Sequence, residues 1–273
     1  MNQSELKIDT DLTRLVETST HKIQLLFAIE SGSRAWGFAS PDSDYDVRFI
    51  YANRPEWYIE RALYHPDKRP DTRSFMTEDK LYDYHGWDLL KTLNLLKKCN
   101  PSLMEWLQSP IVYRQMSVQF VEELKELAAE AWSPVPAFFH YKSMAHTNFR
   151  EHFRGDLVRT KKYLYVLRPI LAARYIVNNL SQPPLNFDEL VDQSDWLGAA
   201  TREAIHNLLA LKRSSSEVKD GPRNKVLHDF IETQFIDLGI LDRTAAHFGS
   251  HIGKVDPEMF TDFLHRWLSA VWE

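Results

Sequence analysis

Residues 31–51, SGSRAWGFASPDSDYDVRFIY, carry the most informative pattern of this chain. Apolar residues at 23–29 predict a strand before it, and the Ser-Pro-Asp-Ser turn at 40–43 leads into a second strand. Because successive side chains of a strand alternate between its faces, Asp44 and Asp46 are expected to point the same way. Two neighbouring carboxylates repel each other by about 1 kcal/mol or more at contact distance. This arrangement therefore indicates a divalent cation between them.

Gly32 and Ser33, near the start of the same stretch, suit contact with a phosphate. Glycine allows a close approach of the backbone, and the following amides and the Ser33 hydroxyl can donate hydrogen bonds to phosphate oxygens. Arg34 can add a positive charge there, although an exposed arginine at a helix start is an equally good explanation. A Gly-Ser pair alone is weak evidence. Followed by Asp44 and Asp46, it predicts a site for a nucleoside triphosphate and two metal ions.

The composition is that of an ordinary soluble globular protein. The chain has 273 residues, of which 44% are hydrophobic and 26% charged, and its formal net charge is -5. That charge argues against a protein that coats nucleic acid through bulk charge. Cys99 is the only cysteine, which excludes a disulfide framework within one chain and favours a reducing cytosol. No apolar run approaches the roughly 20 residues that span a bilayer, and no signal peptide is evident, so we expect a cytoplasmic protein without membrane contact.

The first part of the chain mixes helix and strand patterns. Residues 5–20 predict a helix that leads into the first strand. The charged, proline-containing residues 52–79 predict an extended excursion with a short helix near 58–63. Residues 80–84 predict a third strand, after which Gly86 permits a sharp turn.

Helical periodicity dominates the rest of the chain. Asp88 suits a helix N-cap, and the helix that follows should end near Asn100. The further expected helices cover residues 102–107, 115–131, 136–153, 156–179, 187–192, 199–213, 222–237 and 256–272. The predicted fold class is α+β, with a mixed sheet and helices in residues 1–113 and an all-helical domain in residues 114–273.

A third acid is needed to complete the predicted metal site. Transfer of a nucleotidyl group requires an activated hydroxyl and a neutralised pyrophosphate leaving group, and two magnesium ions can serve both needs. Asp83 suits the third position because it lies on a predicted strand, where it could also accept the hydroxyl proton. Asp88 is the alternative, although it better suits a helix start.

Positive charge gathers in the first helices of the C-terminal part. Between residues 141 and 175 there are eight Lys and Arg residues against two acids, a local balance of +6. Arg154, Lys161 and Arg168 are seven residues apart and lie near one helical face, with Lys162 adjacent. This face suits a triphosphate or a nucleic-acid backbone. The alternative is a solvated helix face that pairs with acids elsewhere.

The order of these motifs resembles the signature of the DNA polymerase β-like nucleotidyltransferase superfamily. The strings GSRAWGFASPDSDYDVRFIY, GWDLLK and NPSLMEWLQSP are similar to one branch, the predicted bacterial and phage nucleotidyltransferases associated with RNA ligases. HYKSMAHTNFR and KKYLYVLRPILAARYI extend the resemblance over residues 25–180. It implies a polymerase β-like nucleotidyltransferase fold with a helical domain that helps cradle substrate. By position it implies Gly32 and Ser33 for the triphosphate, and Asp44 and Asp46 for metal.

The resulting expectation is a metal-dependent nucleotidyltransferase that moves a nucleoside monophosphate from a triphosphate to a hydroxyl and releases pyrophosphate. The expected cofactor is two Mg²⁺ ions, which Mn²⁺ can replace, held by Asp44, Asp46 and Asp83. The residues expected to bind nucleotide are Gly32, Ser33, Arg34, Lys161, Lys162 and Arg168. The acceptor stays open, with an RNA end suggested by the RNA-ligase-associated branch. The alternatives are a non-catalytic nucleotide- or RNA-binding module and a toxin–antitoxin component that modifies a partner protein.

Overall fold

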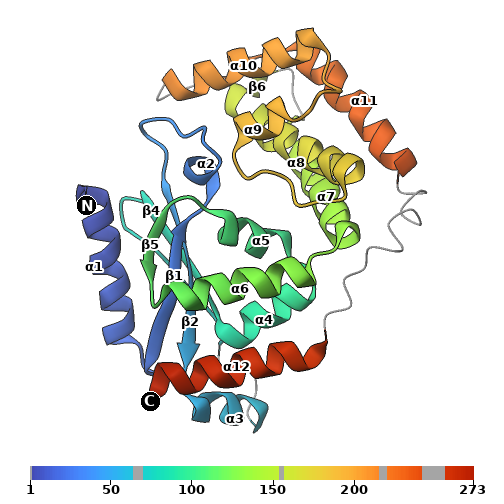
Figure 1. The fold of residues 1–273 in the computed structure, drawn as a ribbon. Coiled ribbons are helices and arrows are strands. Elements are labelled where there is room, and N and C mark those ends of the chain that lie inside the picture. Colours follow the sequence, from blue (N-terminus) through green and yellow to red (C-terminus); the bar gives the residue numbers. More distant parts are fainter. Residues whose placement is uncertain (1, 64–69, 154–156, 215–219, 242–255) are drawn as a thin grey trace. The chain divides into compact units, whose positions relative to one another are not determined.

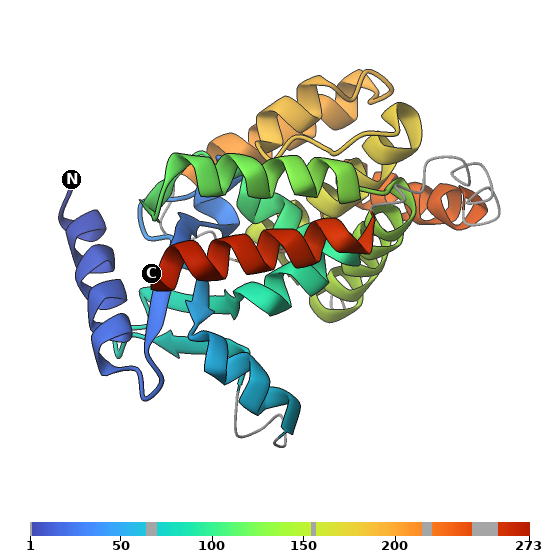
Figure 2. The ribbon, with the colours of Figure 1, turned by 60° about the horizontal axis from the view of Figure 1, so that its bottom comes forward.

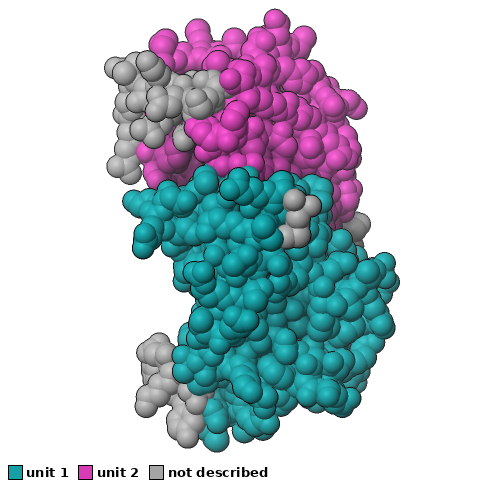
Figure 3. Space-filling view, turned by 90° about the vertical axis from the view of Figure 1, so that its left-hand side faces the viewer, with its two compact units in different colours: residues 1–32, 44–131, 254–273 teal, residues 33–43, 132–253 magenta. Residues whose placement is uncertain are grey.

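The computed structural model describes residues 2–63, 70–153, 157–214, 220–241 and 256–273 (Figure 1). Within these ranges, the side chains of residues 157, 159–161, 220, 240 and 241 are not described. The chain forms two compact units, which Figure 3 shows in different colours: unit 1 contains residues 1–32, 44–131 and 254–273, and unit 2 contains residues 33–43 and 132–253. Among the described helices, none is both long and apolar enough to cross a membrane.

Unit 1 is built on a mixed five-stranded sheet. Its strands are β1 (Ile23–Glu30), β2 (Tyr45–Asn53), β3 (Thr72–Met76), β4 (Tyr82–Asp88) and β5 (Val112–Gln115). They lie in the order β3-β4-β2-β1-β5, with β2 and β4 parallel and the other pairs antiparallel. The starts of β2 and β4 therefore meet at one end of the sheet, next to the end of the antiparallel β1.

Helices cover both faces of this sheet (Figures 1 and 2). On one face, Ile8 and Leu12 of α1 (Gln3–Thr18) form a buried cluster with Val47, Phe49 and Tyr51, the alternate residues of β2. The other face meets α4 (Leu89–Lys97), which contacts β2 and β4, and α5 (Pro101–Gln108). Two further helices, α6 (Val118–Ala131) and α12 (Pro257–Trp272), pack next to α4. Unit 1 thus has the α+β architecture expected for the N-terminal part.

Two strands of the sheet, β3 and β5, are absent from the sequence-based prediction. The predicted excursion over residues 52–79 contains α3 (Pro55–Leu63) and β3, and the expected helix start at residue 115 is the last residue of β5. Both are short edge strands whose residues are largely exposed or half-buried, so they lack the apolar alternation of a buried strand.

The predicted turn at Gly86 is wrong, because β4 continues through this residue to Asp88. Gly86 lies opposite Phe49 in the parallel register, and a Cβ atom on residue 86 would lie 2.1 Å from the Phe49 ring. The glycine therefore makes room for an aromatic ring within the sheet. The helix start predicted at Asp88 is confirmed, since its carboxylate accepts a hydrogen bond from the amide of Leu90 at 2.9 Å.

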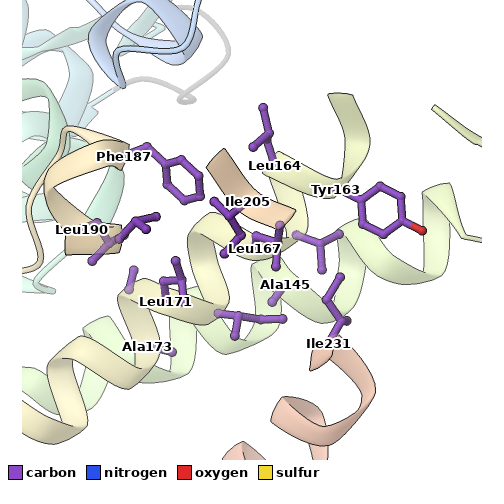
Figure 4. Packing of buried hydrophobic residues seen from close by; sticks show 14 of the residues in the cluster. Ala145, Tyr163, Leu164, Leu167, Leu171, Ala173, Phe187, Leu190, Ile205 and Ile231 are labelled. Carbon is purple, nitrogen blue, oxygen red and sulfur yellow. The ribbon is translucent and has the colours of Figure 1, made fainter. Parts of the chain in front are cut away.

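Unit 2 is mainly helical, as predicted for the C-terminal part. Its helices are α7 (Pro134–His152), α8 (Thr160–Asn179), α9 (Phe187–Asp192), α10 (Ala199–Ser214) and α11 (Lys225–Leu241), and a short antiparallel ladder joins β6 (Leu157–Arg159) to β7 (Asp220–Pro222). Leu164, Leu167 and Leu171 of α8 lie at the centre of its core (Figure 4). The core is completed by residues of α7, α9, α10 and α11.

Segment 33–43, which connects Gly32 to Asp44, belongs to unit 2. Its Phe38 is fully buried, with the Phe187 ring 5.7 Å away, and the amide of Phe187 donates to the carbonyl of Trp36 at 2.9 Å. Sequence reasoning assigned this segment to the N-terminal domain. Its aromatic side chains instead complete the core of the helical unit.

The compact units also divide the rest of the chain differently from the expected split at residues 113/114. Both α6 and the last helix, α12, belong to unit 1. Trp267 of α12 donates a hydrogen bond from Nε1 to Glu123 of α6 at 3.0 Å and packs edge-on against Phe120, with ring centroids 5.2 Å apart. The chain therefore returns to the sheet-containing unit at its end.

Candidate functional site

Asp46 and Asp83 lie side by side at the starts of β2 and β4. They are direct partners in the parallel register, so their side chains leave the same face of the sheet. Nη2 of Arg48 donates to Asp46 Oδ1 at 2.8 Å and to Asp83 Oδ2 at 2.9 Å. The structure thus brings together two of the three acids that the sequence predicts.

Arg48 is a member of this group that sequence reasoning missed. It follows Asp46 by two residues on β2, and the alternation of a strand puts it on the same face. Its other terminal nitrogen, Nη1, donates to the carbonyl oxygen of Asp83 at 3.0 Å. The signal was present in the sequence, because the rule that pairs Asp44 with Asp46 also reaches Arg48.

Asp44 lies one residue before β2 and is exposed. Its negative charge nevertheless affects the pKa of Asp46. Burial raises the pKa of the Asp46 carboxyl above its ordinary value, Arg48 acts in the opposite direction, and the negative charges of Asp44 and Asp83 add to the increase. Asp44 and Asp83 are therefore both within electrostatic reach of Asp46.

Glu30, the last residue of β1, supports Asp46 from the neighbouring strand. Its side chain is fully buried, and Oε1 accepts a hydrogen bond from the Asp46 amide at 2.9 Å. The hydroxyl of Tyr113 on β5 donates to the second carboxylate oxygen of Glu30. This bracing role was not predicted, although an acid that ends an otherwise apolar strand is an unusual feature.

Gly32 packs directly against the carboxylate of Asp46. Its φ is +58°, and a Cβ atom on this residue would lie 2.0 Å from Asp46 Oδ2. The amide of Ser31 donates to the carbonyl of Asp46 at 2.8 Å, which holds the two segments together. The helix predicted after Gly32 is the single turn α2 (Gly32–Ala35). The glycine is therefore required by a close approach of backbone to carboxylate, and this joins the two halves of the motif.

Asp88, the alternative third acid, lies at the other end of β4. It is five residues beyond Asp83, about 16 Å along a strand. Its buried carboxylate accepts from Asn53 Nδ2 at 2.7 Å, from the Tyr58 hydroxyl at 2.9 Å and from the Leu90 amide at 2.9 Å. Burial raises the pKa of Asp88 to about 6. Asp88 therefore caps α4, and Asp83 is the one that lies beside Asp46.

Arg168, a predicted nucleotide-binding residue, is buried inside unit 2. Only 3% of its surface is exposed, and its guanidinium lies over the ring of Trp36, 4.3 Å from the centroid. A cation that stacks on tryptophan in a buried place stabilises that packing. The contact ties α8 to segment 33–43.

The other predicted nucleotide-binding residues beyond Gly32 also belong to unit 2. Ser33 is buried, and Nη2 of Arg34 donates to the Ser43 carbonyl at 2.5 Å. Lys162 is half-buried, with its ammonium 5.3 Å from the centre of the Tyr165 ring. The side chain of Lys161 lies outside the described residues, as does the whole of Arg154.

The donor set at Asp46 and Asp83 suits a hard cation. Among the residues that the structure describes, no three His, Cys, Asp or Glu side chains gather closely enough to hold a metal ion by themselves. Magnesium, however, is usually held by one or two carboxylates together with waters and substrate phosphates. Asp46 and Asp83 supply two carboxylates on adjacent strands, with Asp44 nearby. Such a set fits a magnesium ion whose remaining ligands are waters or phosphate oxygens.

One family model matches most of the chain. The sequence model of RlaP, the RNA repair pathway DNA polymerase beta family, matches residues 5–259 and so includes every residue of the candidate site. The chain is 40% identical over 232 residues to the uncharacterized protein YcgL of Bacillus subtilis (strain 168), an alignment that covers 84% of each chain. It is also similar to the crystal structure of a nucleotidyltransferase-like protein from Exiguobacterium sibiricum 255-15, with 12% identity, coverage of 99% of this chain and 81% of that one, and a TM-score of 0.32.

Proposed function

Because the chain belongs to the RNA repair pathway DNA polymerase beta family, we propose that it is a metal-dependent nucleotidyltransferase. In the proposed reaction, the chain moves a nucleoside monophosphate from a nucleoside triphosphate to a hydroxyl acceptor. The observation that carries this proposal is the pairing of Asp46 with Asp83 on adjacent strands, with the backbone of Gly32 packed against the Asp46 carboxylate.

The proposed reaction balances as a single displacement. The acceptor hydroxyl oxygen forms a bond to the α-phosphorus, the bond from that phosphorus to the bridging oxygen breaks, and pyrophosphate leaves. Asp83 accepts the proton of the acceptor hydroxyl, and Asp46, its partner on the adjacent strand, would hold the cation together with Asp83 and Asp44. Magnesium, when bound, would neutralise charge on the triphosphate and on the attacking oxygen.

The chain's own backbone supplies the phosphate contacts in this proposal. Gly32 allows the backbone to turn beside the Asp46 carboxylate, and the backbone amides that follow it can donate to phosphate oxygens. Ser33, the residue after it, lies in the same single turn, α2.

For the acceptor, we propose an RNA end. The name of the family refers to an RNA repair pathway. Between positions 141 and 175, eight basic residues face two acids in an otherwise acidic chain. Apart from the buried Arg168, this local positive charge suits a phosphate backbone. If the nucleotide were transferred to a protein instead, the function would be modification of a partner protein.

A label-transfer experiment tests the proposal. The protein is incubated with each α-³²P-labelled nucleoside triphosphate, Mg²⁺ or Mn²⁺, and a mixture of RNA oligonucleotides and protein. Metal-dependent label on RNA, lost in Asp46→Asn and Asp83→Asn, is the expected result. The matched control is Asp262→Asn, an exposed aspartate on α12 in the same unit.

The other outcomes contradict the proposal in distinct ways. Label on protein would replace the RNA acceptor with a protein side chain. No label under any condition, with triphosphate binding that Asp46→Asn leaves unchanged, would favour a non-catalytic nucleotide-binding module. Equal transfer by Asp262→Asn and Asp46→Asn would remove the carboxylate pair from the mechanism.

A further inference from the structure

We propose that Arg48 is a built-in counter-ion of the Asp46–Asp83 pair, which a divalent cation must displace and which then binds a phosphate of the incoming triphosphate. The inference rests on the proposed function, because it assigns a role to a residue of the same site. It makes Arg48 a substrate-binding residue that couples the entry of the cation to the entry of the nucleotide.

The geometry places the guanidinium where a bridging cation would lie. A single nitrogen, Nη2, lies 2.8 Å from an oxygen of Asp46 and 2.9 Å from an oxygen of Asp83. Nη1 donates to the backbone carbonyls of Asp83 at 3.0 Å and of Val47 at 3.2 Å. Magnesium between the same two oxygens would need to lie about 2.1 Å from each. The ion and the nitrogen therefore cannot share this place.

Arg48 cannot relieve this conflict by losing its charge, since an arginine stays protonated in proteins. It has to move when a cation binds. Its side chain is 17% exposed, against 26% for Asp46 and 32% for Asp83, so all three side chains are reachable from solvent. The anionic partners that the described residues give it are those two aspartates.

A phosphate is the natural new partner for the displaced guanidinium. Arginine presents a planar fork of donors that matches phosphate oxygens as well as carboxylates. His85 lies opposite Arg48 in the strand register and is not an acid, so the next position along the neighbouring strand offers no replacement anion. When both ligands bind, every charged group of the site therefore has a partner: the cation binds the two carboxylates and a phosphate binds the Arg48 guanidinium.

The test measures the affinities of two ligands, Mn²⁺ and a triphosphate, separately for the wild type and for Arg48→Gln. Mn²⁺ binding without nucleotide is followed by electron paramagnetic resonance, and binding of α,β-non-hydrolysable triphosphates with Mg²⁺ by calorimetry. We expect Mn²⁺ to bind at least tenfold more tightly to Arg48→Gln than to the wild type, and the triphosphates to bind at least tenfold more weakly. These opposite changes cannot come from a damaged fold, which would weaken both.

Two further variants sharpen the result. Arg48→Lys keeps the positive charge and should hold the Mn²⁺ affinity within threefold of the wild-type value. Arg61→Gln is the matched control, since Arg61 forms a 2.8 Å ion pair with Asp71 elsewhere in unit 1 at a similar exposure of 23%. It should change neither affinity.

An unchanged or weaker Mn²⁺ affinity in Arg48→Gln would overturn the inference, as would the absence of Mn²⁺ binding to both proteins. These outcomes are independent of the label-transfer result. If the wild type transfers label but Arg48→Gln binds Mn²⁺ with the same affinity as the wild type, only the counter-ion role is overturned. Opposite affinity changes in a protein that transfers no label would overturn only the proposed function.

Discussion

Gly32 and Asp46 approach each other so closely that residue 32 cannot carry a side chain: a Cβ atom there would lie 2.0 Å from Asp46 Oδ2. The backbone of Gly32 also has a φ of +58°, which disfavours any other residue. The requirement for glycine therefore comes from both the conformation and the neighbouring carboxylate.

Gly32→Ala should consequently displace the Asp46 carboxylate and destabilise the fold. We expect a loss of about 1–3 kcal/mol in the free energy of unfolding, measured with urea, and a clear fall in label transfer. The control is Gly239→Ala in α11, where a Cβ atom would meet nothing within 4 Å. It should be neutral or slightly stabilising, because alanine favours a helix over glycine. Wild-type stability and transfer in Gly32→Ala would contradict the close approach.

Asp83→Asn should remove activity and leave the fold intact. The ion pair of Asp83 with Arg48 is partly exposed, so its loss should change the free energy of unfolding by less than about 1 kcal/mol. We expect label transfer to fall at least about 100-fold, the scale seen when a group that stabilises a transition state is removed. Full transfer by a stable Asp83→Asn protein would assign the third acid to another residue.

Asp88 should make stability depend on pH. Its pKa is raised from an ordinary value of 3.8 to about 6 by burial. A carboxyl with a raised folded-state pKa favours the folded state at low pH, and this contribution is lost as the pH rises through the folded pKa. Relative to Asp88→Asn, the wild type should therefore lose about 2 kcal/mol of unfolding free energy between pH 4 and pH 7. Urea unfolding curves at several pH values check this, and a constant difference between the two proteins would refute it.

Lys212 and Ser40 should be energetically coupled within unit 2. The buried ammonium of Lys212 donates to the Ser40 hydroxyl and, at 3.3 Å, to the hydroxyl of Ser43, the residue before Asp44. Ser40→Ala and Lys212→Met should each cost about 1–3 kcal/mol. The double variant should cost about 0.5–3 kcal/mol less than their sum. A double-mutant cycle by urea unfolding measures this, and strict additivity would show that the contact contributes nothing.

Much of the candidate site could be predicted from local pattern. Strand alternation, applied from Asp46 along β2, reaches Arg48, whereas Asp44 lies one residue before the strand and outside its alternation. The apolar strand pattern also led to Asp83, and the structure places it beside Asp46. These predictions depend on neighbouring residues along one chain segment, where geometry is periodic.

Other features could not be predicted because they depend on partners distant in sequence. Arg168 has the spacing of a ligand-binding cation, yet its guanidinium packs on Trp36, 132 positions earlier in the chain. Glu30 braces the Asp46 amide only because β1 and β2 pair in one register. Edge strands such as β3 have weak apolar patterns and form because β4 offers backbone partners.

The acids, the glycine and the helix caps can be identified from the amino-acid sequence alone, since each follows from the periodicity or backbone conformation of a short segment. Which of these residues meet depends on the tertiary structure. It paired Asp46 with Asp83 through the parallel register and placed Arg48 between their carboxylates. It also gave segment 33–43 to the helical unit, because Phe38 is buried in that unit's core. The burial of a side chain and the register of two strands depend on the whole fold, so they cannot be predicted from the pattern of a short segment.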